Sequence, residues 1–337
     1  MANPVLVEMV RGSHVESIHR GAFVVVRTDG SIAAQAGDIE HPIFPRSSYK
    51  MLQSLLLVES GAADAFGLGQ EELSLACASH SSEPMHTTRV NAWLEKMGLS
   101  DDDLECGPHP LSHKPTRDAM IIAGEEPCRV HNNCSGKHAG FLCVAKHMGV
   151  PTKGYTDPKH PVMMEVANRI ASMCQTDFDD LVPGTDGCGA PNLAMPLHNL
   201  ALGFVRLSDP SNLSDMTGEA ARRLTEAVRA HPRLMSGTDR SCADLIEASN
   251  GRAIIKTGAE GVFAGFDASR KLGIALKIDD GATRASESAI AAILVALGAV
   301  EADDPKVARW LNPTWINTQD KKVGETRPQS ILTINIQ

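Results

Sequence analysis

The position of the strand-like segments restricts the possible folds more than any other feature of the sequence. Val-rich segments lie near the start, at 5–10 and 22–27, and apolar segments separated by glycines come much later, at 252–256, 261–267 and 272–278. Short β-branched and apolar runs bounded by glycines are typical of antiparallel strands joined by tight turns. The sequence therefore predicts strands towards both ends of the chain. Two shorter strands are expected at 32–36 and 330–334.

The middle of the chain has the spacing of amphipathic helices instead. Helices are expected after Ser47 and at 85–97, 139–148, 161–174, 214–230 and 285–300. Strands at both ends with helices between them predict an α+β fold, in which N- and C-terminal strands share one antiparallel sheet packed against helices. We expect one unit over residues 1–337, with a sheet part at about 1–45 and 250–337 and a largely helical part at about 46–249.

Charge and composition exclude several classes of partner. The 337-residue chain has a net charge of −9, which argues against nucleic acid because phosphate binding needs a basic patch. No apolar run is long enough to span a bilayer, so no membrane partner is expected. Residues 1–10 have no basic segment ahead of their apolar residues, so a secretory signal is not expected. The eight cysteines are then expected to be reduced thiols in the cytoplasm, some of them open to metal binding or catalysis.

Ser47 and Lys50 form the only Ser-x-x-Lys sequence in the chain, within Pro45-Arg46-Ser47-Ser48-Tyr49-Lys50. Ser47 is expected to open a helix, with Lys50 on the same face one turn later. A neighbouring neutral amine can take the proton of a serine hydroxyl and make the serine nucleophilic. About one such motif is expected by chance in a chain of this composition. A serine N-cap followed by a solvated lysine is therefore the alternative interpretation.

Lys256-Thr257-Gly258 is a second motif and ends a predicted strand. Ser-x-x-Lys followed later by Lys-Thr-Gly is the pattern of the serine β-lactamase and penicillin-binding-protein superfamily. The Ser-Asp-Asn element of that pattern is absent, although Ser79-His80-Ser81 lies between the two motifs and could supply a hydroxyl. A β-lactamase or esterase on that fold is therefore one hypothesis for the function.

Five motifs in order make the resemblance more specific. They are Pro45-Arg46-Ser47-Ser48-Tyr49-Lys50, Ala78-Ser79-His80-Ser81, Asn132-Asn133-Cys134-Ser135-Gly136-Lys137-His138, Asp186-Gly187-Cys188-Gly189 and Lys256-Thr257-Gly258-Ala259-Glu260-Gly261. Together they resemble the L-asparaginase II family, the class 3 or rhizobial-type asparaginases, over nearly the whole chain. The resemblance implies a β-lactamase-like fold, a single asparaginase catalytic unit and a cytosolic homodimer. The implied reaction is hydrolysis of L-asparagine to L-aspartate and ammonia.

The resemblance also implies a role for particular residues. It makes Ser47 the nucleophile and Lys50 its base. It makes Ser79 and Lys256 a second Ser-Lys pair that relays protons to the leaving ammonia and helps to activate water. Arg46 could hold the substrate carboxylate by two parallel hydrogen bonds. The substrate-binding set expected from the resemblance is Arg46, His138, Asp186 and Cys242.

A cysteine cluster predicts a metal site. By spacing alone, Cys134 with His138 four residues later, together with Asp186 and Cys188, is typical of a zinc ligand set. The resemblance instead implies Cys134, Lys137 and Cys188 as the Zn²⁺ ligands, with Asp186 nearby. His138, the ligand that the spacing suggests, remains the competitor of Lys137. Such an ion would tune substrate binding and need not perform the hydrolysis. Two alternatives remain at this point, which are buried thiols without metal and a zinc-dependent binding protein without catalysis.

Overall fold

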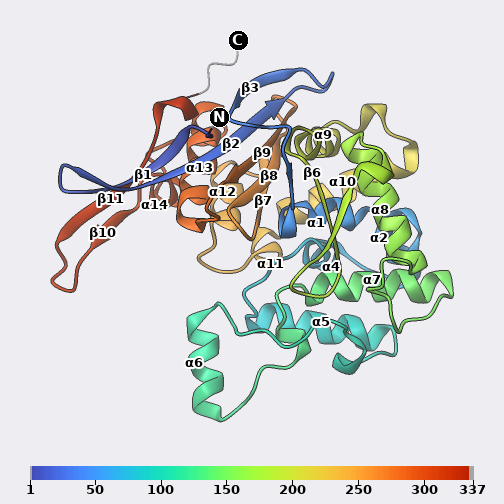
Figure 1. Ribbon diagram of the computed structural model, residues 1–337. Coiled ribbons are helices and arrows are strands. Elements are labelled where there is room, and N and C mark those ends of the chain that lie inside the picture. Colours follow the sequence, from blue (N-terminus) through green and yellow to red (C-terminus); the bar gives the residue numbers. More distant parts are fainter. Residues whose placement is uncertain (1, 334–337) are drawn as a thin grey trace. The chain divides into compact units, whose positions relative to one another are not determined.

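The computed structural model describes residues 2–333 and divides into two compact units, which are treated separately below (Figure 1). The first unit comprises Met1–Tyr49, Ala194–Asp209 and Asp244–Gln337, and the second comprises Lys50–Leu193 and Pro210–Ala243. One boundary between the units falls at the peptide bond from Tyr49 to Lys50, inside the Ser-x-x-Lys motif. No helix among residues 2–333 combines the length and the apolar character that crossing a membrane requires.

The first unit is built on an antiparallel sheet that joins the two ends of the chain. Its strand order is β10-β11-β1-β2-β9-β8-β7, with β3 paired to β2. β1 pairs with β11 through Val7 and Pro328, so N- and C-terminal strands are neighbours. The predicted α+β fold with such a sheet is thereby confirmed. The strands are β1 Val5–Arg11, β2 His14–Val26, β3 Ile32–Ala36, β7 Ala253–Gly258, β8 Val262–Asp267, β9 Leu272–Ile278, β10 Thr314–Ile316 and β11 Lys322–Pro328.

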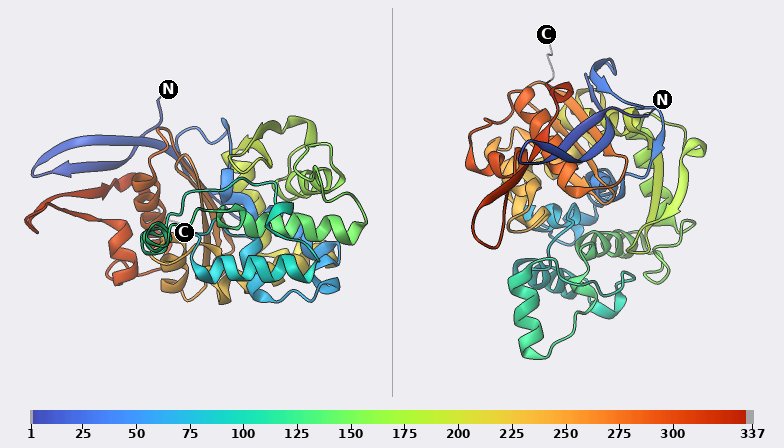
Figure 2. Two further views of the ribbon diagram at one scale, coloured as in Figure 1. Left: turned by 90° about the horizontal axis from the view of Figure 1, so that it is seen from below. Right: turned by 60° about the vertical axis from the view of Figure 1, so that its left-hand side comes forward.

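Helices cover both faces of this sheet, which explains why every residue of β8 is buried. α9 (Leu197–Ser208) and α13 (Thr283–Ala296) lie on opposite sides of β8 and β9 (Figure 1). α9 packs closely because Gly273 has no side chain, and a Cβ there would lie 2.2 Å from the carbonyl oxygen of Ala201. The β1–β2 and β10–β11 hairpins extend beyond these helices (Figure 2). The unit also contains β4 Pro42–Ile43, which pairs with the end of β6 Pro191–Pro196, and α14 Pro305–Leu311.

The prediction of a strand at 330–334 is wrong for residues 330–333, which the structure describes. Residues Ser330–Leu332 form a 3₁₀ turn, η6, and β11 is the last strand among residues 2–333; Ile334 lies outside the described residues. β11 ends at Pro328, which has no N–H to donate to a strand ladder. The next amide, Gln329 N–H, donates to the carbonyl of Leu6, and the chain then turns. The β-branched composition of this segment was outweighed by the proline.

The second unit is helical and surrounds α7 (Ser135–Met148), which is buried on all sides from Ser135 to Ala145. α2, α3, α4, α5 and α8 all pack against α7. The helices of this unit are α1 Lys50–Gln53, α2 Leu55–Glu59, α3 Ala62–Ala65, α4 Gln70–Ala76, α5 Pro84–Lys96, α6 Lys114–Ala123, α8 Pro161–Cys174, α10 Asp215–Ala230 and α11 Pro232–Met235. α12 (Ser241–Ala248) begins here, and the unit also contains η2 Asp101–Asp103, η3 Arg129–His131, η4 Phe178–Asp180, η5 Pro210–Asn212 and β5 Val182–Thr185.

Gly136 allows α4 and α7 to approach closely, so Gly136→Ala is expected to destabilise the protein by about 1–3 kcal/mol. A Cβ at this position would lie 2.3 Å from the carbonyl oxygen of Leu75, which is backbone and cannot rotate away. The free energy of unfolding, measured by urea denaturation, tests this prediction. Gly140→Ala is the matched control, because its Cβ would meet no atom closer than 3.6 Å. Alanine should be neutral or stabilising there, and equal effects of the two substitutions would refute the packing argument.

Candidate active site

Ser47 lies in a strained turn of the first unit. The turn η1 (Arg46–Tyr49) is a 3₁₀ helix that leads directly into α1. Arg46 has φ +55°, in the left-handed region that costs a non-glycine residue about 1–3 kcal/mol. The turn is held by Ser48, whose N–H and hydroxyl both donate to the carbonyl of Pro45, at 3.1 and 2.8 Å. Backbone strain of this kind clusters at functional sites.

The same turn packs against β7, the strand that carries Lys256. A Cβ at Gly258 would lie 2.4 Å from the carbonyl oxygen of Pro45, so only glycine allows this contact. Alternate residues of a strand share one face, so the side chain of Lys256 leaves β7 on the face that η1 covers. Lys256 is fully buried, and its Nζ donates to the carbonyl of Thr257 at 2.9 Å. The first unit therefore brings Lys256 to the turn that holds Ser47.

The second unit brings Lys50 to the segment that holds Ser79. Lys50 is fully buried, and its Nζ donates to the carbonyl of Ala78 at 2.6 Å and to Sγ of Cys134 at 3.0 Å. Ala78 directly precedes Ser79, whose N–H donates to the carbonyl of Met235 at 3.0 Å. Each Ser-Lys pair expected from the resemblance therefore has one member in each unit. Ser47 and Lys256 belong to the first unit, and Lys50 and Ser79 belong to the second.

Glu83 stabilises the loop after Ser79 through hydrogen bonds. The sequence did not indicate this role. The Glu83 carboxylate accepts hydrogen bonds from the hydroxyl of Ser81 at 2.6 Å and from the amide and hydroxyl of Thr238, both at 2.7 Å. Gly237, with φ +127°, lets the second segment approach, since a Cβ there would lie 2.0 Å from Oγ of Ser81. Burial would raise the pKa of Glu83, but these hydrogen bonds outweigh burial and hold the pKa below its ordinary value.

Glu83→Gln is expected to lower the free energy of unfolding at pH 7 by about 1.5–3 kcal/mol, because hydrogen bonds to a charged acceptor are lost. Since the folded-state pKa lies below the unfolded value, the stabilisation is complete above pH about 4.3 and is lost as the pH falls through the folded-state pKa. Urea denaturation between pH 7 and acid should show the two proteins converging. Glu95→Gln, on the exposed side of α5, should leave stability unchanged. A difference that stays constant in acid would contradict this account of Glu83.

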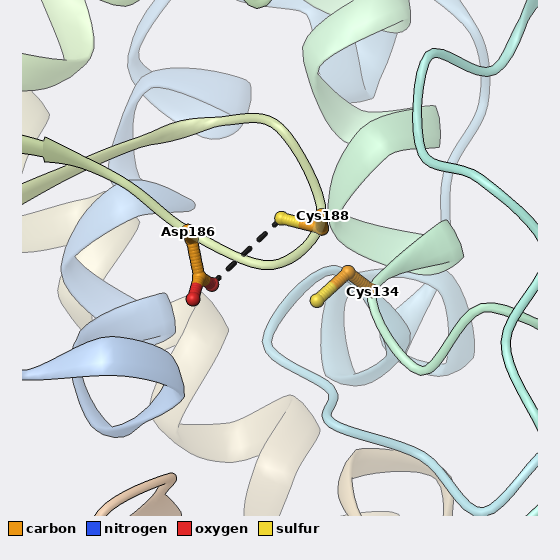
Figure 3. Close-up of side chains that lie close together, drawn as sticks. All are labelled: Cys134, Asp186 and Cys188. Carbon is orange, nitrogen blue, oxygen red and sulfur yellow. Dashed lines mark hydrogen bonds between the residues drawn. The ribbon is translucent and has the colours of Figure 1, made fainter.

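A thiol cluster lies at the start of α7. Ligand atoms of Cys134, Asp186 and Cys188 lie within 4.8 Å of one another, and their side chains converge from the start of α7 and the loop after β5 (Figure 3). Sγ of Cys188 is 3.8 Å from Oδ2 of Asp186. The Nζ of Lys137 donates to Sγ of Cys188 at 3.2 Å. The structure thus brings together Cys134, Lys137 and Cys188, the three residues expected as metal ligands, and places Asp186 beside them.

The cluster has an uneven charge distribution. The pKa of Cys188 is held well below its usual range, first by a hydrogen bond from the Cys134 thiol and then by the Lys137 ammonium, against the effect of burial. The same hydrogen bond and burial raise the pKa of Cys134. Burial disfavours a charge on Lys137, but attraction to Cys188, Cys134 and Asp186 exceeds this penalty and raises its pKa. The cluster therefore favours a thiolate at Cys188 beside an ammonium at Lys137.

The donor set fits a zinc ion. Ligands at about 2.0–2.3 Å from a tetrahedral ion lie about 3.3–3.8 Å apart, close to the separations of Cys188 from Lys137 and Asp186, 3.2 and 3.8 Å. Binding would require Lys137 to lose its proton, since only the neutral amine has a lone pair. Between residues 2 and 333, this is the one such group of three Cys, His, Asp or Glu side chains, and His138 is outside it. The geometry therefore favours Lys137 over His138 as the nitrogen ligand.

His138 is connected to residues that sequence reasoning missed. Its Nδ1 lies 2.6 Å from the hydroxyl of Tyr155, and that hydroxyl accepts a hydrogen bond from the amide of Glu105 at 2.9 Å. Burial, and then the charge of Lys137, lower the pKa of His138 to about 3. No local pattern marks Tyr155 or Glu105, because they lie 17 and 33 positions from His138. Cys242, the remaining predicted site residue, is buried in the first turn of α12.

A family comparison covers nearly the entire chain. The model of L-asparaginase II matches residues 7–328. This match makes the protein an amidohydrolase, an enzyme that hydrolyses amide bonds. The chain belongs to the L-asparaginase II family. A comparison with curated proteins gives no match.

Solved structures similar to this chain include several β-lactamases. A putative β-lactamase from Bacteroides dorei aligns with 77% of this chain and 84% of its own, at 12% identity and a TM-score of 0.41. A class C β-lactamase mutant aligns over 79% and 89%, at 14% identity and a TM-score of 0.40. A β-lactamase from Mycobacterium bovis aligns over 79% and 89%, at 12% identity and a TM-score of 0.37. Alignments this distant carry no information about substrate or mechanism.

Proposed function

We propose that this amidohydrolase is an L-asparaginase that works through an acyl-enzyme on Ser47. The family match over residues 7–328 carries the proposal. Lys50 takes the proton of Ser47 as the hydroxyl attacks the side-chain amide carbon of asparagine. The tetrahedral intermediate collapses to an aspartyl ester, and the amide nitrogen leaves as ammonia after gaining a proton. Water then hydrolyses the ester, which releases aspartate and restores the serine.

The burial of both lysines supports their proposed roles. Lys50 and Lys256 are fully buried, which is typical of lysines that act as bases in catalysis. Lys50 lies beside the backbone of Ala78, so the base of the first step borders the segment of Ser79. Ser79 and Lys256 would deliver the proton to the leaving nitrogen and help to activate water.

Binding of the amino-acid part of the substrate completes the proposal. The guanidinium of Arg46 would hold the α-carboxylate by two hydrogen bonds. His138, Asp186 and Cys242 are the other proposed substrate-binding residues. We also propose that the chain works as a cytoplasmic homodimer and a single catalytic unit, since the cytoplasm would keep Cys134 and Cys188 reduced. Light scattering of the purified protein measures the dimer.

Release of ammonia from L-asparagine by the purified protein tests the proposed function. Glutamine and a chromogenic β-lactam serve as comparison substrates. We expect turnover of asparagine to exceed that of both. Lactam hydrolysis without ammonia from asparagine would replace the proposal by a β-lactamase-like activity. Zinc-dependent stability without hydrolysis of any of the three would replace it by a binding function.

Zinc is proposed as the metal of the cluster, with Cys134, Lys137 and Cys188 as ligands and Asp186 beside them. When bound, the ion would supply a fixed positive charge that tunes substrate binding. The chain's own residues perform the proton transfers of the proposed reaction. Hydrogen bonds from Lys50 to Sγ of Cys134 and from Lys137 to Sγ of Cys188 hold the two sulfur atoms in place.

Cys134→Ala and Cys188→Ala are each expected to lose most of the bound zinc, because each removes a thiolate or thiol ligand. Metal content after dialysis, measured by mass spectrometry, tests the prediction. Cys143→Ala is the matched control, since Cys143 is a buried thiol of α7 whose Sγ contacts the carbonyl of Ala62. Unchanged zinc in both ligand variants would show that the ligands are assigned wrongly.

A further inference from the structure

Three buried groups form a hydrogen-bonded chain that ends at an unused nitrogen. The amide of Glu105 donates to the hydroxyl of Tyr155, which lies 2.6 Å from Nδ1 of His138. Tyr155 and His138 are both fully buried. Nε2 of His138 is also buried and has no hydrogen-bond partner among residues 2–333. A buried polar atom left without a partner calls for an explanation.

Counting protons fixes the direction of the bond between Tyr155 and His138. If Nδ1 carried a proton, it would donate to the Tyr155 oxygen, and the tyrosine O–H would have no acceptor in the described part of the chain. The same defect arises if the ring carries protons on both nitrogens. If Tyr155 donates to Nδ1 instead, both its proton and its oxygen are used, because the oxygen still accepts from the amide of Glu105. The second arrangement satisfies every group except Nε2, which must then bear the ring proton.

We infer that Tyr155 holds His138 as the Nε2–H tautomer and so makes it a hydrogen-bond donor to the carboxylate of the bound amino acid, and not a metal ligand. This inference rests on the proposed function for the identity of the ligand. In this tautomer neither ring nitrogen has a lone pair to offer, since Nδ1 is occupied by the tyrosine proton. His138 could therefore bind zinc only if the hydrogen bond with Tyr155 were reversed, which would leave the tyrosine O–H without an acceptor in the described part of the chain.

The surroundings of His138 favour an anionic acceptor. Nε2 is enclosed by protein, so its N–H cannot obtain an acceptor from solvent. A buried N–H donor matches a carboxylate better than a cation or an apolar group, because hydrogen bonds to a charged acceptor are the stronger ones. A substrate such as asparagine brings such a carboxylate, and the unpaired donor would find its acceptor when the substrate binds. Tyr155 is thus a positioning residue, because it acts on the substrate only through His138.

The tautomer can be observed without any substrate. Long-range ¹H–¹⁵N correlation spectra of the full-length protein distinguish a protonated ring nitrogen from one with a lone pair, and His138→Gln identifies the signals. We expect a protonated Nε2 and an unprotonated Nδ1 in the wild type, and a mixture of tautomers in Tyr155→Phe. A protonated Nδ1 in the wild type would overturn the inference. This result is independent of the asparaginase proposal, which the ammonia assay judges separately.

Kinetics with asparagine test the role of the donor. Tyr155→Phe and His138→Leu should each raise KM by about 10- to 100-fold, the range for one hydrogen bond to a charged acceptor, with kcat changed much less. His138→Gln keeps an N–H near the position of Nε2 and should restore most of the affinity. Adding Tyr155→Phe in the His138→Gln background should then have no further effect. A further tenfold loss in that background would show that Tyr155 acts through the fold, and would overturn its assigned role.

Discussion

Ser47→Ala is expected to lower the rate of ammonia release from L-asparagine by about 10⁴- to 10⁶-fold, the scale on which removal of a catalytic nucleophile acts. The methyl group of alanine cannot form the aspartyl ester, so the first step of the proposed reaction is lost. Stability should hardly change, because the turn that carries Ser47 is held by Ser48 and Pro45. Steady-state ammonia release and thermal unfolding of the purified variant measure the two effects.

Ser48→Ala is the matched control for this substitution. Ser48 is fully buried in the same turn, and its hydroxyl donates to the carbonyl of Pro45 at 2.8 Å. Its loss should cost about 1 kcal/mol of stability and leave most of the activity. Near-normal turnover in Ser47→Ala would remove Ser47 as the nucleophile. A loss of activity in Ser48→Ala as large as in Ser47→Ala would show that the turn as a whole, and not one hydroxyl, was being measured.

Lys50→Met is expected to lower kcat by about 10²- to 10⁴-fold, the contribution usual for a general base, while the free energy of unfolding changes by only about 1–2 kcal/mol. Methionine fills a similar volume without an amine. The variant loses the bonds to Ala78 and Cys134, but it no longer buries a strongly hydrated group. Kinetics and urea denaturation of the same preparation separate the two quantities.

Lys146→Met controls for the loss of a lysine bonded to a backbone carbonyl. Lys146 is an exposed residue of α7 whose Nζ donates to the carbonyl of Met97 at 2.7 Å. Activity should remain at the wild-type level in this variant. If Lys50→Met kept its turnover, or if its activity fell only in proportion to its stability, Lys50 would be a structural lysine and another base would have to be found.

Elements bounded by strong local signals could be predicted from sequence. α8 begins at Pro161 and ends at Cys174 as expected, because proline is favoured in the first helical turn and the apolar spacing in between is regular. β8 and β9 were predicted from apolar runs between glycines, because continuous apolar runs are typical of strands buried on both faces. In each case the neighbouring residues alone determine the element.

Elements that depend on distant partners were missed. β2 begins at His14, eight residues before the expected start, because its first half is polar and is stabilised by pairing with β1. α6 was assigned to no element, and none of its residues is buried; its first turn is capped by the side chain of His113, which accepts from the amide of Thr116. Propensity is overridden in such segments by pairing and capping that the local sequence does not contain.

The candidate site divides in the same way. Residues within short motifs, such as Ser47, Lys50 and Cys134, could be proposed from sequence and from resemblance. The residues that hydrogen-bond to the site could not be proposed, because Thr238 binds Glu83 from 155 positions away and Tyr155 binds His138 from 17 positions away. Contacts of this kind form only when the chain folds, and the spacing of the residues along the sequence does not predict them.

The path of the chain between its two units has a consequence for how such an enzyme can change during evolution. The polypeptide passes from one unit to the other after Tyr49, Leu193, Asp209 and Ala243, so neither unit is a continuous stretch of sequence. Gene recombination that exchanges a contiguous block would split at least one unit. The two halves must therefore be inherited together, and new specificities would arise by point substitution within the chain and not by shuffling of modules.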